Sequence, residues 1–233
     1  MRVGILAPMP QELDAVLADF DADRAELVAG RLFHRGEAES VEAVAVISGI
    51  GKTSVAATTT LLIERYGVER IVLIGVAGAV SRELALGDIV VATAALHHDL
   101  DASPVFPRYC VPSLGVERVP CDTALSALAL AAAQEFADGS SARVWRGLVV
   151  SGDRFLEPAE IAELRERLPD ALAVEMEGAA VAQVCAEAGV PCAIVRSISD
   201  DGSISAFARF LERDAGRHAE GIIAPLLRAC GRK

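Results

Sequence analysis

The chain has 233 residues, of which 52% are hydrophobic and 24% are charged, and its formal net charge is −11 at pH 7. This length and apolar content suit one α/β domain that spans residues 1–233. The negative charge argues against a broad electrostatic grip on nucleic acid or on an anionic membrane, so we expect neither as a partner, although local donors could still hold a small anion.

Apolar runs and helical patterns alternate along the chain. In chain order they predict a strand at 2–7, a helix from Pro10 to about Phe20, a strand pair between 26 and 35, a strand at 41–48, a helix at 52–66, and strands at 70–76 and 88–96. The proline-rich segment 97–121 is predicted as a loop. Then follow a helix at 123–136, a strand at 143–150, a helix at 158–168, a strand at 171–176, a helix at 177–188, a strand at 191–199 and one long helix from about 205.

This alternation indicates the α/β class. Strands that are apolar throughout are typical of a sheet covered by helices on both faces. We therefore predict a three-layer α/β/α domain around a central mixed, mostly parallel twisted sheet.

Cysteine usage and the N-terminus bear on the compartment. The number of cysteines is odd and no pair has C-x-x-C spacing, which favours a reducing compartment over a disulfide framework or a zinc knuckle; they are Cys110, Cys121, Cys185, Cys192 and Cys230. The N-terminal apolar run is too short for a signal peptide, and no uncharged apolar stretch reaches the roughly 18 residues of a membrane span. We expect a cytoplasmic protein.

Unusual residues cluster where predicted strands end. In open parallel sheets, ligands gather at the carboxyl ends of strands, so these segments should meet at one edge. They are 9–12, 48–52, 75–79, 151–155, 175–177 and 196–200.

Each acidic residue in these segments has a purely structural alternative. Glu12, Glu175 and Glu177 stand near helix starts, where a carboxylate stabilises the helix dipole and the free N–H groups. Asp200 could cap the last helix, but Asp201 or Ser203 could do so equally well and leave Asp200 free for chemistry.

Three other segments resemble known ligand-binding motifs but lack residues that those motifs need. Gly49–Thr53 lacks the earlier glycine of a P-loop, because that position is Val46, and Gly75–Ala79 is not a dinucleotide-binding G-x-G-x-x-G turn. His97 and His98 are adjacent and have no second histidine group to complete a metal site, so a structural or interface role is favoured.

Four segments together carry a resemblance to a known family. They are Ser48–Lys52, Ser151-Gly152-Asp153-x-Phe155, Val174-Glu175-Met176-Glu177-x-Ala179-Ala180, and Val195-Arg196-x-Ile198-Ser199-Asp200. In this order and spacing they resemble the purine nucleoside phosphorylase superfamily, and within it the hydrolytic 5′-methylthioadenosine/S-adenosylhomocysteine nucleosidases. The resemblance covers nearly the whole chain and implies cleavage of the N-glycosidic bond of an adenine nucleoside by water.

The resemblance also implies roles for individual residues. Asp200 would protonate N7 of adenine, with Ser199 holding its side chain. Glu12 would activate the attacking water, with Arg196 nearby. The substrate-binding set would comprise Met9, Ile50, Ala77, Gly78, Phe155, Leu156, Glu175, Met176, Glu177 and Phe207.

The same resemblance implies partners and cofactors. No metal and no organic cofactor is expected. The family is typically homodimeric, and Val105 and its neighbours in the 97–121 loop would reach the partner's pocket.

Hydrolysis is favoured over phosphorolysis because Glu12 stands where the phosphorylases have an Arg-rich phosphate loop, and its carboxylate would repel phosphate. One departure is Val76, which stands where these nucleosidases usually have a hydroxyl residue that binds water. It keeps open a non-catalytic nucleoside sensor. A nucleosidase for futalosine, aminodeoxyfutalosine or another 5′-modified adenosine also stays open, because futalosine-type nucleosidases share the Met-Glu-Gly-Ala-Ala of residues 176–180. Asp200 favours adenine over a 6-oxopurine, because its carboxyl can accept from the 6-amino group while donating to N7.

Overall fold

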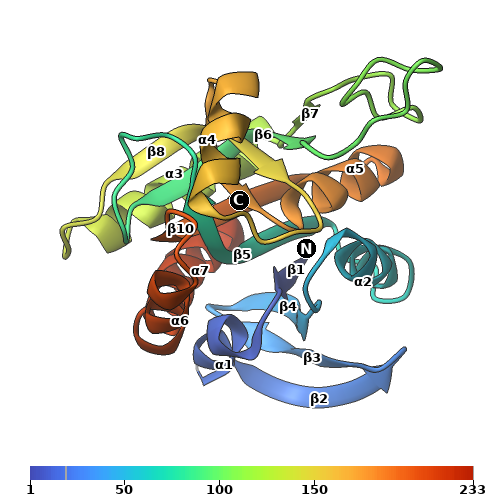
Figure 1. Cartoon of the computed structure of the whole chain (residues 1–233). Coiled ribbons are helices and arrows are strands. Elements are labelled where there is room, and N and C mark those ends of the chain that lie inside the picture. The colour runs from blue at the N-terminus through green and yellow to red at the C-terminus, as the bar shows by residue number, and fades with distance from the viewer. Residues whose placement is uncertain (19, 233) are drawn as a thin grey trace.

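The computed structural model of the chain describes residues 1–18 and 20–232. A mixed β-sheet with helices on both sides forms the molecule (Figure 1). Its strands are β1 (Arg2–Ala7), β2 (Asp21–Val28), β3 (Arg31–Ala38), β4 (Val41–Ile47), β5 (Arg70–Ala79), β6 (Ile89–His97), β7 (Val119–Pro120), β8 (Val144–Ser151), β9 (Ala171–Glu175) and β10 (Cys192–Asp200). Its helices are α1 (Pro10–Ala18), α2 (Lys52–Glu64), α3 (Thr123–Ala137), α4 (Pro158–Arg167), α5 (Gly178–Ala188), α6 (Ile204–Arg213) and α7 (Ala215–Gly231).

The sheet combines a closed circuit with an open wing. The strand order is β10-β6-β8-β9-β5-β1-β4-β3-β2, and β10 also pairs with β5. Strands β5, β9, β8, β6 and β10 therefore close on one another, while β1, β4, β3 and β2 extend from β5. Since β1, β5 and β10 are parallel, their carboxyl ends lie at one edge.

Alternating side chains on the central strands build two cores. Leu6 of β1 and Leu73 of β5 face a core shared with α2 and α5. Their neighbours Ile5 and Val72 face the opposite core, which includes residues of α1, α3 and α7. Burial on both faces explains why these strands are apolar throughout.

The predicted α/β class with a mixed central sheet is confirmed, and the closed circuit is an additional feature that the pattern did not predict. The single long C-terminal helix was a wrong prediction. The chain leaves helical geometry at Asp214 and forms α6 and α7. The two helices serve different partners, because Phe207 and Phe210 of α6 pack near Val76, whereas the buried face of α7 joins the core of α1 and α3.

Smaller boundaries also differ. Helix α1 ends at Ala18, before Asp19, which lies outside the described residues, and not at Phe20. The 97–121 loop contains the two-residue strand β7, which pairs with β6. Within the described part of the chain, no helix combines the length and the hydropathy needed to cross a membrane.

Candidate active site

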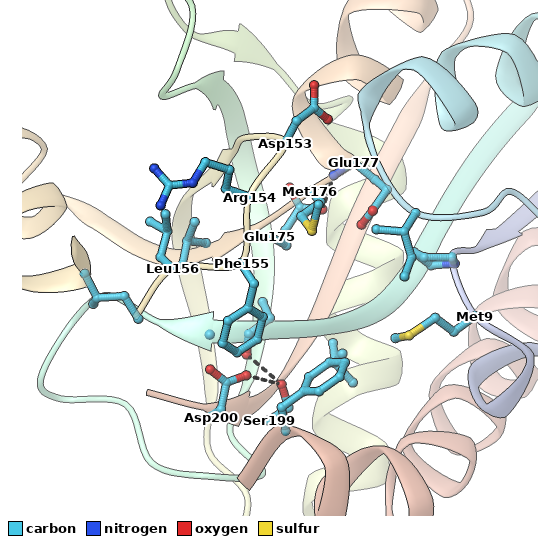
Figure 2. Close-up of a pocket in the computed structure, with 18 of the residues that line it drawn as sticks. Met9, Asp153, Arg154, Phe155, Leu156, Glu175, Met176, Glu177, Ser199 and Asp200 are labelled. Carbon is cyan, nitrogen blue, oxygen red and sulfur yellow. Dashed lines mark hydrogen bonds between the residues drawn. The ribbon is translucent and has the colours of Figure 1, made fainter. Parts of the chain in front are cut away.

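A cavity of about 370 Å³ opens at the carboxyl ends of the central strands (Figure 2). Its walls come from six separate stretches of sequence, as expected from the edge at which the parallel strands β1, β5 and β10 end, and the end of β9, which pairs antiparallel with β5, also contributes. The lining residues are Pro8, Met9, Glu12, Ile50, Val76, Ala77, Gly78, Asp153, Arg154, Phe155, Leu156, Ile161, Val174, Glu175, Met176, Glu177, Ser199, Asp200 and Phe207.

Asp200, the last residue of β10, is buried in this wall with an exposed fraction of 2%. The Ser199 hydroxyl lies 2.8 Å from its Oδ2, and the backbone N–H of Gly202 donates to its Oδ1 at 2.8 Å (Figure 2 shows the Ser199 contact). Burial raises the pKa of Asp200, although these two hydrogen bonds lower it in part. The carboxyl is therefore fixed in orientation and biased toward keeping its proton.

The close approach of Asp200 to β5 depends on Gly78. Gly78 is the register partner of Asp200 in β5, and a β-carbon there would lie 3.2 Å from Asp200 Oδ1. The absence of a side chain thus leaves room for the carboxyl. Helix α6 is capped by Ser203, whose hydroxyl accepts from the N–H of Ala206, so Asp200 is not its cap.

Glu12 lies in the first turn of α1 and is 1% exposed. The N–H of Met9 donates to its Oε2 and the N–H of Val76 donates to its Oε1, both at 2.9 Å. Burial raises its pKa to about 7, although the charge of Arg196 and the two backbone donors oppose the shift. Glu12 thus binds the N–H of the residue just before α1 and also connects α1 to β5.

A buried arginine neutralises two other carboxylates of the site. The Arg196 side chain is 0% exposed, and its Nη2 donates to Glu175 and, at 3.2 Å, to Glu177 Oε2. Its guanidinium lies against Gly75, its register partner on β5, where a β-carbon would overlap Nη1 and lie 2.9 Å from Glu12 Oε1. Arg196 is therefore surrounded by carboxyls and lies behind the pocket wall.

Glu175 and Glu177 are both buried but have different hydrogen-bond partners. The Glu175 carboxylate accepts from the backbone N–H groups of Glu177 and Gly178 and from the Ser151 hydroxyl, so it caps α5. The Glu177 side chain makes no cap hydrogen bond and accepts instead from the N–H of Gly51 at 2.8 Å. Burial and the neighbouring Glu175 raise the pKa of Glu177. The capping alternative thus applies to Glu175 and not to Glu177.

The front of the cavity is apolar and more open. Phe155 is 39% exposed, and its ring meets that of Phe207 edge-on at a centroid distance of 5.7 Å. Ile50 is 54% exposed, and Ile50 and Met9 both line the pocket.

A polar latch fastens the loop that carries Phe155. The ammonium of Lys52, the first residue of α2, lies 2.6 Å from Asp99 Oδ1 and 3.7 Å from Asp153 Oδ2. The backbone N–H of Lys52 donates to Asp153 Oδ1 at 2.9 Å, and the N–H of Asp153 donates to Asp99 Oδ2 at 3.0 Å. The Lys52–Asp99–Asp153 latch therefore joins α2, the start of the 97–121 loop and the 151–157 loop.

Comparisons with known proteins agree with this geometry. A family model described as the phosphorylase superfamily matches residues 2–228. The aminodeoxyfutalosine nucleosidase of Helicobacter pylori (strain J99) is 36% identical over 224 residues, covering 94% of this chain and 95% of the relative. The 5′-methylthioadenosine/S-adenosylhomocysteine nucleosidase of Geobacillus thermodenitrificans is 38% identical over 232 residues, covering 97% and 96%.

A solved structure is similar to this chain over nearly its whole length. It is the 5′-methylthioadenosine/S-adenosylhomocysteine nucleosidase of Colwellia psychrerythraea 34H in complex with adenine, with a TM-score of 0.90 and 31% identity over 97% of this chain and 94% of that one. The chain belongs to the phosphorylase superfamily. Within it, the chain is a nucleosidase of the group that includes the methylthioadenosine/adenosylhomocysteine nucleosidases and the futalosine hydrolases.

The structure brings the predicted site residues of this nucleosidase together. Arg196 lies near Glu12, as expected, and its charge acts on that carboxyl, but it stands behind the cavity wall and contacts Glu175 and Glu177. Val76 stands where the nucleosidases usually have a hydroxyl residue. It lines the cavity, and its backbone N–H donates to Glu12.

Sequence reasoning missed the supporting contacts. It assigned no role to Ser151, which binds Glu175, or to the latch residues Lys52 and Asp99. The signal for Ser151 was present, because this hydroxyl residue ends a buried strand next to Gly152. The latch joins positions 47 to 101 residues apart, and no local pattern predicts such a pairing.

The adjacent histidines have structural surroundings in this nucleosidase. His97 Nε2 lies 3.1 Å from Gln183 Oε1, and His98 packs against Gly152, where a β-carbon would overlap its ring. Among the described residues, no group of three or more His, Cys, Asp or Glu side chains is arranged to hold a metal ion.

Proposed function

We propose that this pocket hydrolyses the N-glycosidic bond of 5′-substituted adenine nucleosides, with methylthioadenosine and S-adenosylhomocysteine as substrates, and releases adenine and the ribose derivative. The observation that carries the proposal is the pair of buried carboxyls with raised pKa, Asp200 and Glu12, which come from different elements and line one cavity. An acid and a base of this kind are what glycosidic hydrolysis requires.

Asp200 is the proposed general acid. Purine anions are poor leaving groups, so a proton on N7 weakens the glycosidic bond as the sugar carbon becomes cationic. The raised pKa of Asp200 favours the protonated form that such a step needs. The Ser199 hydroxyl lies between Asp200 Oδ2 at 2.8 Å and the Ala77 carbonyl oxygen at 3.3 Å. It can donate to Ala77 while the carboxyl is protonated, and donate to the carboxylate after proton transfer.

Glu12 is the proposed general base. With a pKa of about 7, a substantial fraction is ionised at neutral pH and can accept a proton from water. Its two oxygens are oriented by backbone N–H groups of Met9 and Val76, so the missing hydroxyl at position 76 leaves the base itself in place.

Glu177 and Met176 are proposed to hold the ribose. Glu177 Oε1 is held by the Gly51 N–H and Oε2 by Arg196, so its carboxylate has a fixed direction from which to accept sugar hydroxyls. Phe155 and Leu156 would contact adenine, with the exposed ring of Phe155 available for stacking.

The charge of the pocket supports water over phosphate as the nucleophile. Glu12 and Glu177 line it and carry negative charge when ionised, whereas the lining cation Arg154 is engaged with Glu160. Arg196 is neutralised by Glu175 and Glu177. A phosphate dianion would therefore meet mainly like charge in a partly buried space.

The apolar front supports a small thioether as the 5′-group. Met9, Ile50 and Phe207 line this side, and a methylthio group would bury apolar surface against them. Aminodeoxyfutalosine is the second candidate, because a relative of similar identity is named for it.

A homodimer is proposed as well. Val105 in the 97–121 loop is 79% exposed in one chain, and Phe106 beside it is partly exposed. Insertion of this loop beside a partner's pocket would cover apolar surface on both chains. A cytoplasmic location fits the reduced cysteines expected there.

The test is to measure the rate of adenine release in phosphate-free buffer. The substrates are methylthioadenosine, S-adenosylhomocysteine, 5′-deoxyadenosine and aminodeoxyfutalosine. We expect release without phosphate and the highest kcat/KM for methylthioadenosine or S-adenosylhomocysteine. Strict phosphate dependence would contradict hydrolysis, and preference for aminodeoxyfutalosine would move the substrate to the second candidate. Adenine binding without turnover of any nucleoside would instead indicate a sensor.

A further inference from the structure

A second cavity, of about 330 Å³, lies on the other side of α6 from the active site. It is bounded by α6, the start of α7, the turn at 86–87 and the segment 140–142. The residues that line it are all different from those of the first cavity. It is therefore a separate hollow that the nucleosidase chemistry does not use.

Three arginines give this cavity its charge. Arg209 and Arg213 are exposed and four residues apart on α6, so they share one helix face. Neither has an ion-pair partner among residues 1–18 and 20–232. Arg217 forms an ion pair with Asp214 at 3.3 Å and lies over the Phe136 ring. The cavity thus has a surplus of positive charge in a chain whose net charge is −11.

Packed rings form the floor of the cavity. His218 is buried, its Nδ1 lies 2.9 Å from Ser197 Oγ, and its ring contacts Phe136 and Phe210 at centroid distances of 4.7 and 5.2 Å. Burial, with a contribution from Arg217, lowers the pKa of His218 to about 4, so it is neutral at pH 7 and the arginines supply the charge. Leu86 forms an exposed apolar wall.

The unpaired arginines and the apolar wall of this cavity indicate a class of ligand. Guanidinium groups present a planar fork of donors that matches phosphate oxygens, and a dianion would neutralise the two unpaired arginines. The apolar wall and floor formed by Leu86 and Phe210 would contact an organic group attached to that phosphate. We propose that this cavity is a second binding site and that it takes a phosphomonoester with an apolar organic part.

Occupation of the second cavity has a consequence for α6. Phe207 lines the active site and Phe210 lines the second cavity, so one turn of α6 separates the two. A ligand held by Arg209 and Arg213 would restrain the helix that carries Phe207. Amide hydrogen exchange along α6 should therefore slow when the site is filled.

The experiment is calorimetric titration of the full chain with phenyl phosphate and, separately, inorganic phosphate at constant ionic strength. The proteins are wild type, the double variant R209Q/R213Q and the control R146Q, which removes an exposed arginine of β8 outside both cavities. All three substituted positions are exposed, and thermal unfolding checks that each variant is folded. Binding is measured directly, so the result is independent of whether the proposed nucleosidase substrates are correct.

We expect phenyl phosphate to bind wild type and R146Q alike and more tightly than inorganic phosphate, and to bind R209Q/R213Q about tenfold more weakly or worse. Equal affinity in all three proteins would overturn the site. Equal binding of phosphate and phenyl phosphate would overturn the assignment to an ester. Exchange slowed at 153–156 and 175–177 in place of 204–218 would also overturn it, because the ligand would then occupy the active site.

Discussion

The rear and the front of the active-site cavity are built in different ways. At the rear, Asp200, Glu12 and Arg196 are almost completely buried, and backbone donors or opposite charges fix each of them. At the front, Ile50 and Phe155 leave much of their surface in solvent. If the proposed function holds, one chain supplies the residues for bond cleavage at the rear, whereas recognition of the 5′-group depends on the exposed side chains at the front.

The largest expected effect comes from removing the proposed proton donor at the rear of the cavity. Asp200→Asn keeps the shape of the side chain but cannot deliver a carboxyl proton to the base. We expect kcat for methylthioadenosine to fall by about 10²- to 10⁴-fold, the usual contribution of a general acid. Steady-state adenine release measures the loss, and circular dichroism with thermal unfolding checks the fold.

The control is Asp201→Asn, the exposed acid next along the chain, whose charge makes only a small contribution to the raised pKa of Asp200. It should leave kcat within about a factor of two, since exposed substitutions rarely matter by more than about 0.5 kcal/mol. Near-normal turnover in Asp200→Asn would remove this residue from the role of acid.

The next effect concerns the base and its pH dependence. The pKa of Glu12 is raised to about 7, so the carboxyl is protonated and inactive as a base at lower pH. We expect kcat/KM to rise with pH through about 7 in wild type. Glu12→Gln should lower kcat by about 10²-fold and abolish this rise.

Asp14→Asn, on the exposed side of the same helix, is the control for Glu12 and should retain the wild-type pH profile. The carboxyl of Glu177 also has a raised pKa. If the rise persists in the residual activity of Glu12→Gln, the titrating group is not Glu12.

The smallest expected effect is that of a substitution at the front of the active-site cavity. Lys52→Met removes the ammonium of the Lys52–Asp99–Asp153 latch, while the backbone hydrogen bond of residue 52 to Asp153 can remain. The loop that carries Phe155 should become less ordered before substrate binds. We expect KM to rise about fivefold, equivalent to roughly 1 kcal/mol, with little change in kcat.

Arg65→Met, which removes an exposed ion pair with Glu26 near the other end of α2, should leave KM unchanged. An equal fall in kcat for Lys52→Met, with KM unaltered, would show that the latch supports the rear of the cavity and not its front.

The sequence predicted the fold well where one physical rule decides the outcome. The all-apolar runs at Val3–Ala7 and Ile71–Ile74 identify buried strands, because both faces of such a strand must be covered. The carboxyl-end rule then indicated that Glu12, Glu177 and Asp200 would lie close together, and in the structure they line one cavity.

Other features depended on contacts that no local pattern encodes. The helix from 205 continues in its periodicity across Asp214, and only the separate packing partners of α6 and α7 divide it. The position of Arg196 follows from the space beside Gly75 on another strand, and the closed circuit follows from the extra pairing of β10 with β5. These features depend on tertiary contacts between segments that are distant in the sequence.

The missing side chain at Gly75 has an implication for how this site can change through evolution. A methyl group at that position and a guanidinium nitrogen of Arg196 need the same volume, so the two are mutually exclusive. Losing the cation would leave Glu12, Glu175 and Glu177 crowded together without a counterion. Viable sequences should therefore vary positions 75 and 196 together or not at all, although neither residue lines the cavity.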